Sequence, residues 1–298
     1  MYVNVLIDEQ KFKENYEILS DYKFDFEMEK RCIDYIKNKK GNQLSCMRTL
    51  SSEYKVLASK KLLIENNLNS FRLNCHISEK LKILGTSKES RLYKASYSLF
   101  GLIMSNNKEW ISFLKNNLNY ITSNDFNSKE NTYIKSKDLH RNSFLSKTTI
   151  LALLGDFEEV EKRSKKYLEE PLTKSYYAYT KYDFMFFEAL VNKNTEKMKR
   201  AIHKLLEPKI AKKILFDTDI NYSFYLNIYV LMYSKIALLH GFDLGINDKT
   251  APKNLIDNTS LQSYEEPYDF MKKIDLVTLT PEKWKEWTED YSIIVPIT

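Results

Sequence analysis

The stretch between residues 221 and 256 constrains the fold of this chain more than any other. Residues 222–239 include no Gly or Pro and only one charged side chain, Lys235. The apolar residues recur at helical spacing around most of the circumference, which is typical of a helix buried on most sides. Gly241 follows at the position where a left-handed residue ends a helix. We therefore expect a buried core helix over residues 222–239, ended by Gly241.

A membrane span is the competing interpretation of this run. The run has about the minimum length for a span, but Ser223, Asn227, Ser234 and Lys235 interrupt it. No basic and aromatic residues bracket it as they bracket membrane helices. The N-terminal residues lack the basic and apolar regions of a secretory signal. We therefore expect a cytoplasmic protein with no membrane partner.

Residues that interrupt helices are scarce along the whole chain. The 298 residues include six Gly and six Pro, whereas average usage would give roughly 20 and 15. Long elements with short connections are therefore favoured, and the spacing of apolar residues makes these elements helices. Four helices are expected in the N-terminal part, over residues 11–19, 24–37, 44–64 and 66–84.

From residue 92 the chain repeats one unit, in which an apolar helix, a tight polar turn and a more charged amphipathic helix follow one another. The turns fall at residues 105–107, 155–156 and 192–194. Asp156 and Glu159 have the spacing of a capping box. The period is too irregular for a strict repeat protein. We predict an all-α fold, an irregular stack of antiparallel helical hairpins that is solenoid-like or a compact superhelix, with short β segments at the two termini.

The whole chain, residues 1–298, is expected to form a single mainly helical domain. A subdivision is the alternative, because residues 122–138 are polar and rich in Asn and Ser, as linkers are. It would separate an N-terminal helical half (1–122), a C-terminal half (139–275) and a tail (276–298). Near the end of the C-terminal half, Pro267 is expected to open a short helix.

Charge does not indicate a nucleic-acid partner. The formal net charge is +6, from 46 basic and 40 acidic residues that are interspersed along the chain. Nucleic-acid binding requires a concentrated basic stripe. The densest basic set, Lys162, Arg163, Lys165 and Lys166, shares its predicted helix with several acidic residues. We therefore predict that this set forms a solvated, ion-paired helix face.

Residue patterns that carry chemistry are not found. The four His are isolated from one another, and no glycine-rich phosphate loop is present. Cys32, Cys46 and Cys75 lie far apart without a CxxC pair, which fits reduced thiols in the cytoplasm. Neighbouring carboxylates on a helix point in different directions, so they do not make an acid–base pair. We expect no catalytic residues, no metal, no cofactor and no enzyme activity.

Aromatic residues are the strongest compositional feature, with 21 Tyr, 16 Phe and 3 Trp. They concentrate in residues 176–187 and 222–233. Helix-to-helix packing explains most of them, and the outward-facing Tyr residues would form a protein-binding surface. The three hairpin turns are also expected to line up on one edge. The candidate partner-binding residues are Tyr176, Tyr177, Tyr179, Asp156 and Glu159.

Three segments of the C-terminal half share a pattern of residue types with a known family. They are FMFFEALVNKNTEKMKRAIHKLL at residues 184–206, LMYSKIALLHGFDLGINDKTAPKNLI at residues 231–256, and the Tyr-Asp-Phe cluster at residues 268–270. Through them, residues 145–271 resemble the immunity protein 49 family of bacterial polymorphic toxin systems. The N-terminal half is similar only in its helical character, and the tail from residue 275 does not match.

This resemblance implies a non-enzymatic, cytoplasmic protein that binds the toxin domain of a partner encoded beside it. It would neutralise that toxin by covering the toxin's active site or substrate surface, and so protect the producer cell. Gly241, Asp243, Pro252 and Leu255 lie at family-like positions, where we expect them to hold a loop against the core helix.

Two further classes of function stay open. One is a helical-repeat scaffold or regulator, similar to tetratricopeptide arrays, that takes a peptide or protein in a concave groove. The other is an enzyme or RNA-binding protein whose site assembles from distant residues such as Lys137, His140 and Arg141. The oligomeric state and the chemistry of the toxin are likewise open.

Overall fold

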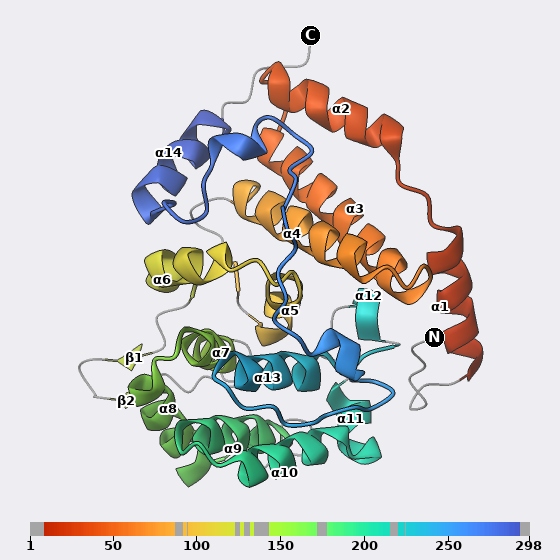
Figure 1. Ribbon diagram of the computed structural model, residues 1–298. Coiled ribbons are helices and arrows are strands. Elements are labelled where there is room, and N and C mark those ends of the chain that lie inside the picture. The colour runs from red at the N-terminus through yellow and green to blue at the C-terminus, as the bar shows by residue number, and fades with distance from the viewer. Residues whose placement is uncertain are drawn as a thin grey trace.

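The computed structural model describes residues 9–86, 92–93, 95–122, 126–127, 132–133, 143–171, 178–214, 220–223 and 225–292. These residues form fourteen α-helices, α1 to α14, arranged as an irregular stack (Figure 1). The all-α prediction is therefore confirmed. The described strands are the two-residue β1 (Phe126–Asn127) and β2 (Thr132–Tyr133), which pair antiparallel. The β segments predicted at the termini lie outside the described residues.

The N-terminal layer is built on two long helices that form an antiparallel hairpin, with a third helix across one end and a fourth along the side (Figure 1). All four predicted helices are present, within a few residues of the expected bounds. They are α1 (Glu9–Asp21), α2 (Phe26–Lys37), α3 (Gln43–Leu63) and α4 (Leu68–Leu84). Asn42 and Asn67 begin the hairpin helices, because each side chain accepts a first-turn backbone N–H, at 2.8 and 3.0 Å.

Of the three predicted units, the second and third form helical hairpins that stack side by side through α8 and α9, whereas the two helices of the first make little contact with each other. A short 3₁₀-helix, η1 (Ser96–Leu99), leads into the first of them. The hairpin helices are α5 (Phe100–Met104), α6 (Glu109–Ile121), α7 (Leu145–Leu154), α8 (Phe157–Glu169), α9 (Thr180–Val191) and α10 (Thr195–Leu206). The helix α11 (Pro208–Ile214) extends the third hairpin. The repeating unit predicted from the sequence is therefore a packed helical hairpin in its second and third copies.

The turns of the second and third hairpins use the same local chemistry. Gly155 (φ +77°) and Lys193 (φ +52°) each end a helix in the left-handed conformation. The next residue, Asp156 or Asn194, donates its backbone N–H back to the ending helix and caps the following one with its side chain. This arrangement satisfies backbone groups that a helix end leaves free. Two residues (155–156) in the second hairpin and three (192–194) in the third therefore reverse the chain between antiparallel helices.

Replacing Lys193 by glycine is expected to raise the free energy of unfolding by about 1 kcal/mol, because glycine adopts the left-handed conformation without strain. Gly155→Ala is the opposite control, since a Cβ there is strained and lies 3.4 Å from Cε1 of His240. Urea unfolding of both variants measures the effect. Shifts of the same sign in the two variants would contradict this account.

The apolar run at residues 222–239 forms two helices instead of one. These are α12 (Ile220–Ser223) and α13 (Ile228–Leu239). Asn227 separates them: its Oδ1 accepts the N–H of Val230 at 3.3 Å, and its Nδ2 donates to the carbonyl of Leu205 at 3.1 Å. The prediction of one uninterrupted helix is wrong because Asn227 caps a new helix. The prediction of burial is confirmed, since Ile228 to Ala237 are all buried.

Gly241 ends α13 as predicted. Its φ is +88°, its N–H donates to the carbonyl of Leu238 at 3.0 Å, and the N–H of Phe242 donates to that of Ala237 at 2.9 Å. These two bonds are the Schellman arrangement that closes a helix. The chain then turns back along the surface of α13.

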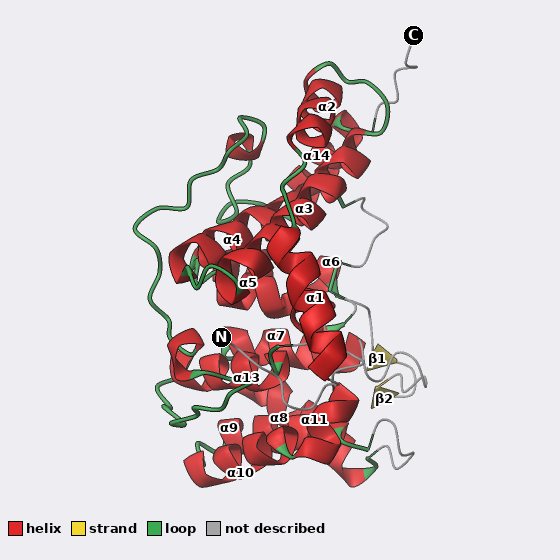
Figure 2. Ribbon diagram, turned by 90° about the vertical axis from the view of Figure 1, so that its right-hand side faces the viewer, coloured by secondary structure: helices red, strands yellow, loops and turns green. Residues whose placement is uncertain are grey.

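Residues 257–279, which we call the strap, connect this loop to the last helix. They run from α13 across the α5–α6 turn and α4 to α14 (Pro281–Asp290), on the outside of the helical layers (Figures 1 and 2). Two 3₁₀-helices lie along this path, η4 (Lys253–Leu255) before the strap and η5 (Met271–Lys273) within it. Instead of the helix expected from Pro267, only η5 forms. Thr280 caps α14 and Pro281 takes its first turn, a signal that the sequence analysis missed.

One cluster of buried hydrophobic residues extends from α1 to α14. The aromatic residues of the C-terminal half belong mainly to it, including Phe184, Phe186, Phe187, Tyr229 and Tyr233. None of the described helices combines the length and apolar character that crossing a lipid bilayer requires.

Candidate functional site

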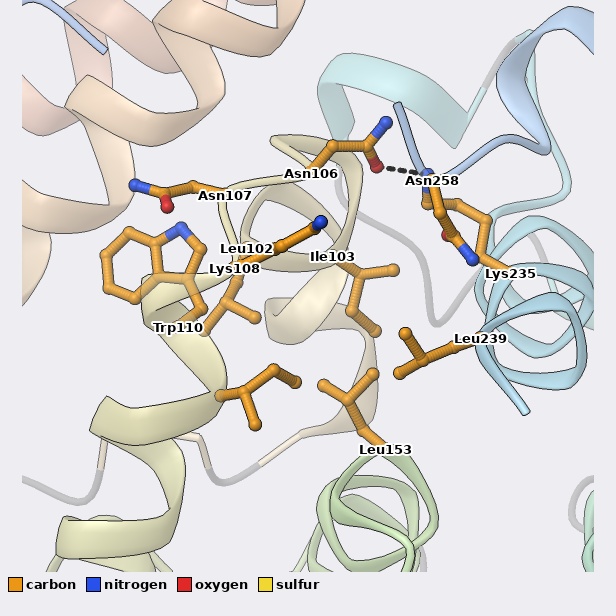
Figure 3. A pocket seen from close by; sticks show the side chains of 11 residues that line it. Leu102, Ile103, Asn106, Asn107, Lys108, Trp110, Leu153, Lys235, Leu239 and Asn258 are labelled. Carbon is orange, nitrogen blue, oxygen red and sulfur yellow. Dashed lines mark hydrogen bonds between the residues drawn. The ribbon is translucent and has the colours of Figure 1, made fainter. Parts of the chain in front are cut away.

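A small apolar pocket of about 80 Å³ lies where α5 and α6 meet α7 and α13 (Figure 3). Four of its apolar walls are Leu102, Ile103, Trp110 and Leu153, with Leu239 on the α13 side. The hairpin geometry produces it, since the end of α13 and the end of α7 both approach the α5–α6 turn. The rim nearest the strap is polar and carries the chemistry of the site.

Lys235, the single charge of the core run, is the central group of that rim. Its side chain is buried, with the residue 3% exposed, and Nζ donates to Oδ1 of Asn106 and to the backbone carbonyl of Asp257. The pKa of Lys235 is lowered to about 7, because burial outweighs the opposing effect of the Asp257 carboxylate and the nearby Arg72 acts in the same direction as burial. This amine therefore exchanges a proton near neutral pH.

Asp257 joins three separate segments. Its carboxylate forms an ion pair with Arg72 on α4, accepts from Nδ2 of Asn106 at 3.2 Å, and accepts from the N–H of Thr259 at 2.8 Å. Asn106 is held in the left-handed region at φ +58°, and its Nδ2 also donates to the carbonyl of Thr259 at 3.0 Å. The beginning of the strap is thus bonded to α4, α13 and the α5–α6 turn.

A second polar cluster holds the middle of the strap. Glu266 pairs with Lys80 on α4, and its Oε1 lies 3.7 Å from Nε2 of His76. Burial alone would raise the pKa of Glu266, but hydrogen bonds from His76 and Lys80 hold that pKa below its usual value. The hydroxyl of Tyr264 donates to the carbonyl of Ser105 at 2.7 Å. These contacts cover the first hairpin turn.

Chemically, this site is a clamp. The polar groups of Arg72, Asn106, Lys235 and Asp257 bond to one another and to the strap backbone, so the chain itself occupies them. Within the described ranges, no group of three or more His, Cys, Asp or Glu is placed to hold a metal ion. The arrangement fastens the strap and closes one end of the apolar pocket.

The candidate partner-binding residues that the structure describes lie at the start of α8 and just before α9. Asp156 is exposed, and its Oδ1 accepts the N–H of Glu159 at 3.3 Å, which is one half of the predicted capping box. The backbone N–H of Asp156 instead donates to the carbonyl of Leu151 at 3.0 Å, and a carboxylate oxygen of Glu159 lies 3.6 Å from Nη1 of Arg163. Tyr179 is 5% exposed, which leaves little of it to a partner. Tyr176 and Tyr177 lie outside the described residues.

The four family-like positions build the loop after α13. Gly241 ends the helix, and Oδ1 of Asp243 accepts the N–H of Gly245 at 2.8 Å in a turn. Pro252 precedes η4, and Leu255 inside η4 is buried against the core. Each of them shapes the path of the backbone.

One expectation about the surface is wrong, and another part of that surface is covered by the strap. The basic set on α8 is not one solvated face: Lys162 and Lys165 form exposed ion pairs with α8 carboxylates, but Arg163 is 1% exposed. Its Nε donates to Oγ1 of Thr148 at 2.9 Å, and its guanidinium lies 4.0 Å from the Phe144 ring centre, so it packs between α7 and α8. The strap covers the first of the three hairpin turns, because Ser105 is buried and its carbonyl accepts the hydroxyl of Tyr264.

Sequence reasoning missed the clamp itself. A signal was present, because Lys235 is the single charge in a buried run and a buried charge requires partners. The partners Arg72, Asn106 and Asp257 lie up to 185 residues apart and carry no common motif. The other open candidates, Lys137, His140 and Arg141, lie outside the described residues.

Comparison of the chain with models of known protein families, with curated proteins and with solved structures finds no match.

Proposed function

We propose that this chain is an immunity protein of the producer's cytoplasm, which binds a toxin domain encoded beside it and neutralises that toxin by covering its active site or substrate surface. The activity is binding through a shaped helical surface, without bond-making by side chains of this chain. Cofactors and metals have no part in it.

The observation that carries the proposal is how the family-like segments fold. The segment at residues 184–206 forms the hairpin α9–α10, with Phe184, Phe186 and Phe187 buried, and the segment at residues 231–256 forms α13 and its return loop. Both segments act as scaffold. The clamp supports the same reading, because its polar groups are used to fasten the strap and not to meet a small molecule.

Co-expression with the C-terminal domain of the protein encoded by the adjacent gene tests the proposal. We expect that domain alone to stop growth, and the full chain to restore growth and to co-purify with the domain as a stable complex. The matched control is the domain expressed with an unrelated helical protein of similar size. Continued growth arrest without a complex would refute the proposal.

The helical-repeat scaffold is the alternative, and the stacked hairpins α7–α8 and α9–α10 favour it. A scaffold of that kind would bind short free peptides of the partner as tightly as its folded domain. Titration of the full chain with the folded domain and with overlapping peptides from it separates the two functions. Under the immunity proposal only the folded domain binds.

A further inference from the structure

The outer edge formed by residues 14–27 is strongly acidic, and we call it the acidic edge. It comprises the second half of α1, the connection to α2 and the start of α2, along the side of the molecule at the right of Figure 1. The chain as a whole carries a net charge of +6, yet this edge has five carboxylates and one basic residue, Lys23. All five carboxylates are exposed: Glu14, Glu17, Asp21, Asp25 and Glu27.

Two large apolar side chains stand among these carboxylates. Ile18 is 70% exposed and Phe26 is 71% exposed, whereas the other exposed large hydrophobic residues of the described part are 40–45% exposed. Single exposed apolar residues are common on protein surfaces. An exposed aromatic ring within a rim of charges, however, is the arrangement found at binding hot spots.

The acidic edge is held rigidly on α3. Nζ of Lys60 donates to the carbonyls of Ser20 and Tyr22, both at 2.7 Å, and the hydroxyl of Tyr22 donates to Glu53 at 2.5 Å. The ring of Phe24 packs on Tyr54 with centroids 5.3 Å apart. A surface fixed in this way loses little conformational entropy when a partner binds.

The carboxylates of the edge are available for such a partner. No described cation lies within ion-pair distance of Glu17, Asp21 or Glu27, although the α1 residues Glu9 and Lys13 do pair, at 2.9 Å. Asp25 caps α2 by accepting the N–H of Met28 at 2.8 Å. These negative charges repel a second copy of the same edge or an acidic partner, and they attract a basic partner.

We propose that the acidic edge is the docking surface for a basic protein domain, with Phe26 and Ile18 as its apolar anchors. This inference rests on the proposed function, under which that domain is the toxin. A stable interface covers roughly 800 Å² on each partner, so one basic domain can span both anchors. The carboxylates steer its approach, and the two anchors slow its release.

The test measures binding of the full chain to the same C-terminal domain by surface plasmon resonance at low and high NaCl. The double variant Ile18→Ala, Phe26→Ala is expected to weaken binding about 100-fold, mainly by faster dissociation. The triple variant Glu17→Gln, Asp21→Asn, Glu27→Gln is expected to slow association about tenfold and to flatten its dependence on salt. The control Val277→Ala, Asp269→Asn removes an exposed apolar and an acidic side chain from the strap and should bind as the unmodified chain does.

Circular dichroism and the urea midpoint establish that each variant is folded. A complex whose affinity and salt dependence are unchanged in both edge variants overturns the inference and leaves the proposed function standing. Absence of any complex with the unmodified chain refutes the proposed function. Self-association of the unmodified chain that both edge variants abolish would identify a second copy as the occupant, and would overturn the basic partner.

Discussion

Replacing Asp257 by alanine is expected to lower the free energy of unfolding by about 3 kcal/mol, because it leaves a buried charge without its partner. Arg72 is 6% exposed and pairs with this carboxylate. The N–H of Thr259 loses its acceptor at the same time, and Nδ2 of Asn106 loses one of its two. Urea unfolding followed by far-ultraviolet circular dichroism gives the difference.

Asp243→Ala is the matched control for this experiment. Asp243 and Asp257 each accept the N–H of the residue two positions later, at 2.8 Å in both turns, but Asp243 is exposed. Its replacement is expected to cost about 1 kcal/mol or less, the net value of one exposed hydrogen bond. Equal losses in the two variants would show that the turn, and not the ion pair with Arg72, carries the effect.

Raising the pH from 7 to 9 is expected to stabilise the folded protein by about 2 kcal/mol through Lys235. Burial lowers the pKa of Lys235 to about 7 in the fold, from 10.5 in the unfolded chain. Between these values the unfolded chain binds more protons at this amine, so protonation favours unfolding and its loss favours the fold. Urea unfolding at pH 7, 8 and 9 in a reducing buffer measures the rise.

The stabilisation through Lys235 is measured only up to pH 9, because above that pH other groups lower the free energy of unfolding. Burial raises the pKa of the Cys32 thiol to about 12 and that of the Tyr225 hydroxyl to about 12, and these groups stabilise the fold only while they stay protonated. Lys235→Met removes the titrating amine with little change in side-chain length, and its stability should vary little between pH 7 and 9. A slope as steep in this variant as in the unmodified chain would assign the effect to another group.

The helices were predictable because their signals are local. Apolar spacing and capping residues such as Asn67 and Asp156 lie within one or two turns of the helix ends that they set. The errors arose where the type of one residue is compatible with two structural roles. Asn227 looks like an interruption of a helix but caps a new one. Thr280 and Pro281 have the pattern of a helix start, but no helix was predicted in the tail.

The clamp and the acidic edge were harder to predict, each for its own physical reason. The clamp depends on contacts between Arg72, Asn106, Lys235 and Asp257, and sequence spacing carries no information about which helices meet. The acidic edge is contiguous in sequence, but its amphipathic pattern does not show that Phe26 faces outward. Basic residues elsewhere in the chain outweigh these carboxylates, so the net charge of +6 gives no sign of an acidic surface.

The strap has a consequence for folding during synthesis, because a ribosome makes the N-terminal part of the chain first. Arg72 and Lys80 leave the ribosome early, yet their carboxylate partners Asp257 and Glu266 emerge some 185 residues later. Until then, the growing N-terminal hairpin carries cationic groups whose native counterions have not been made. Contacts of such long sequence separation slow folding and lengthen the time during which apolar surface is exposed. Truncation before residue 257 should therefore produce an aggregation-prone fragment and not a smaller working protein.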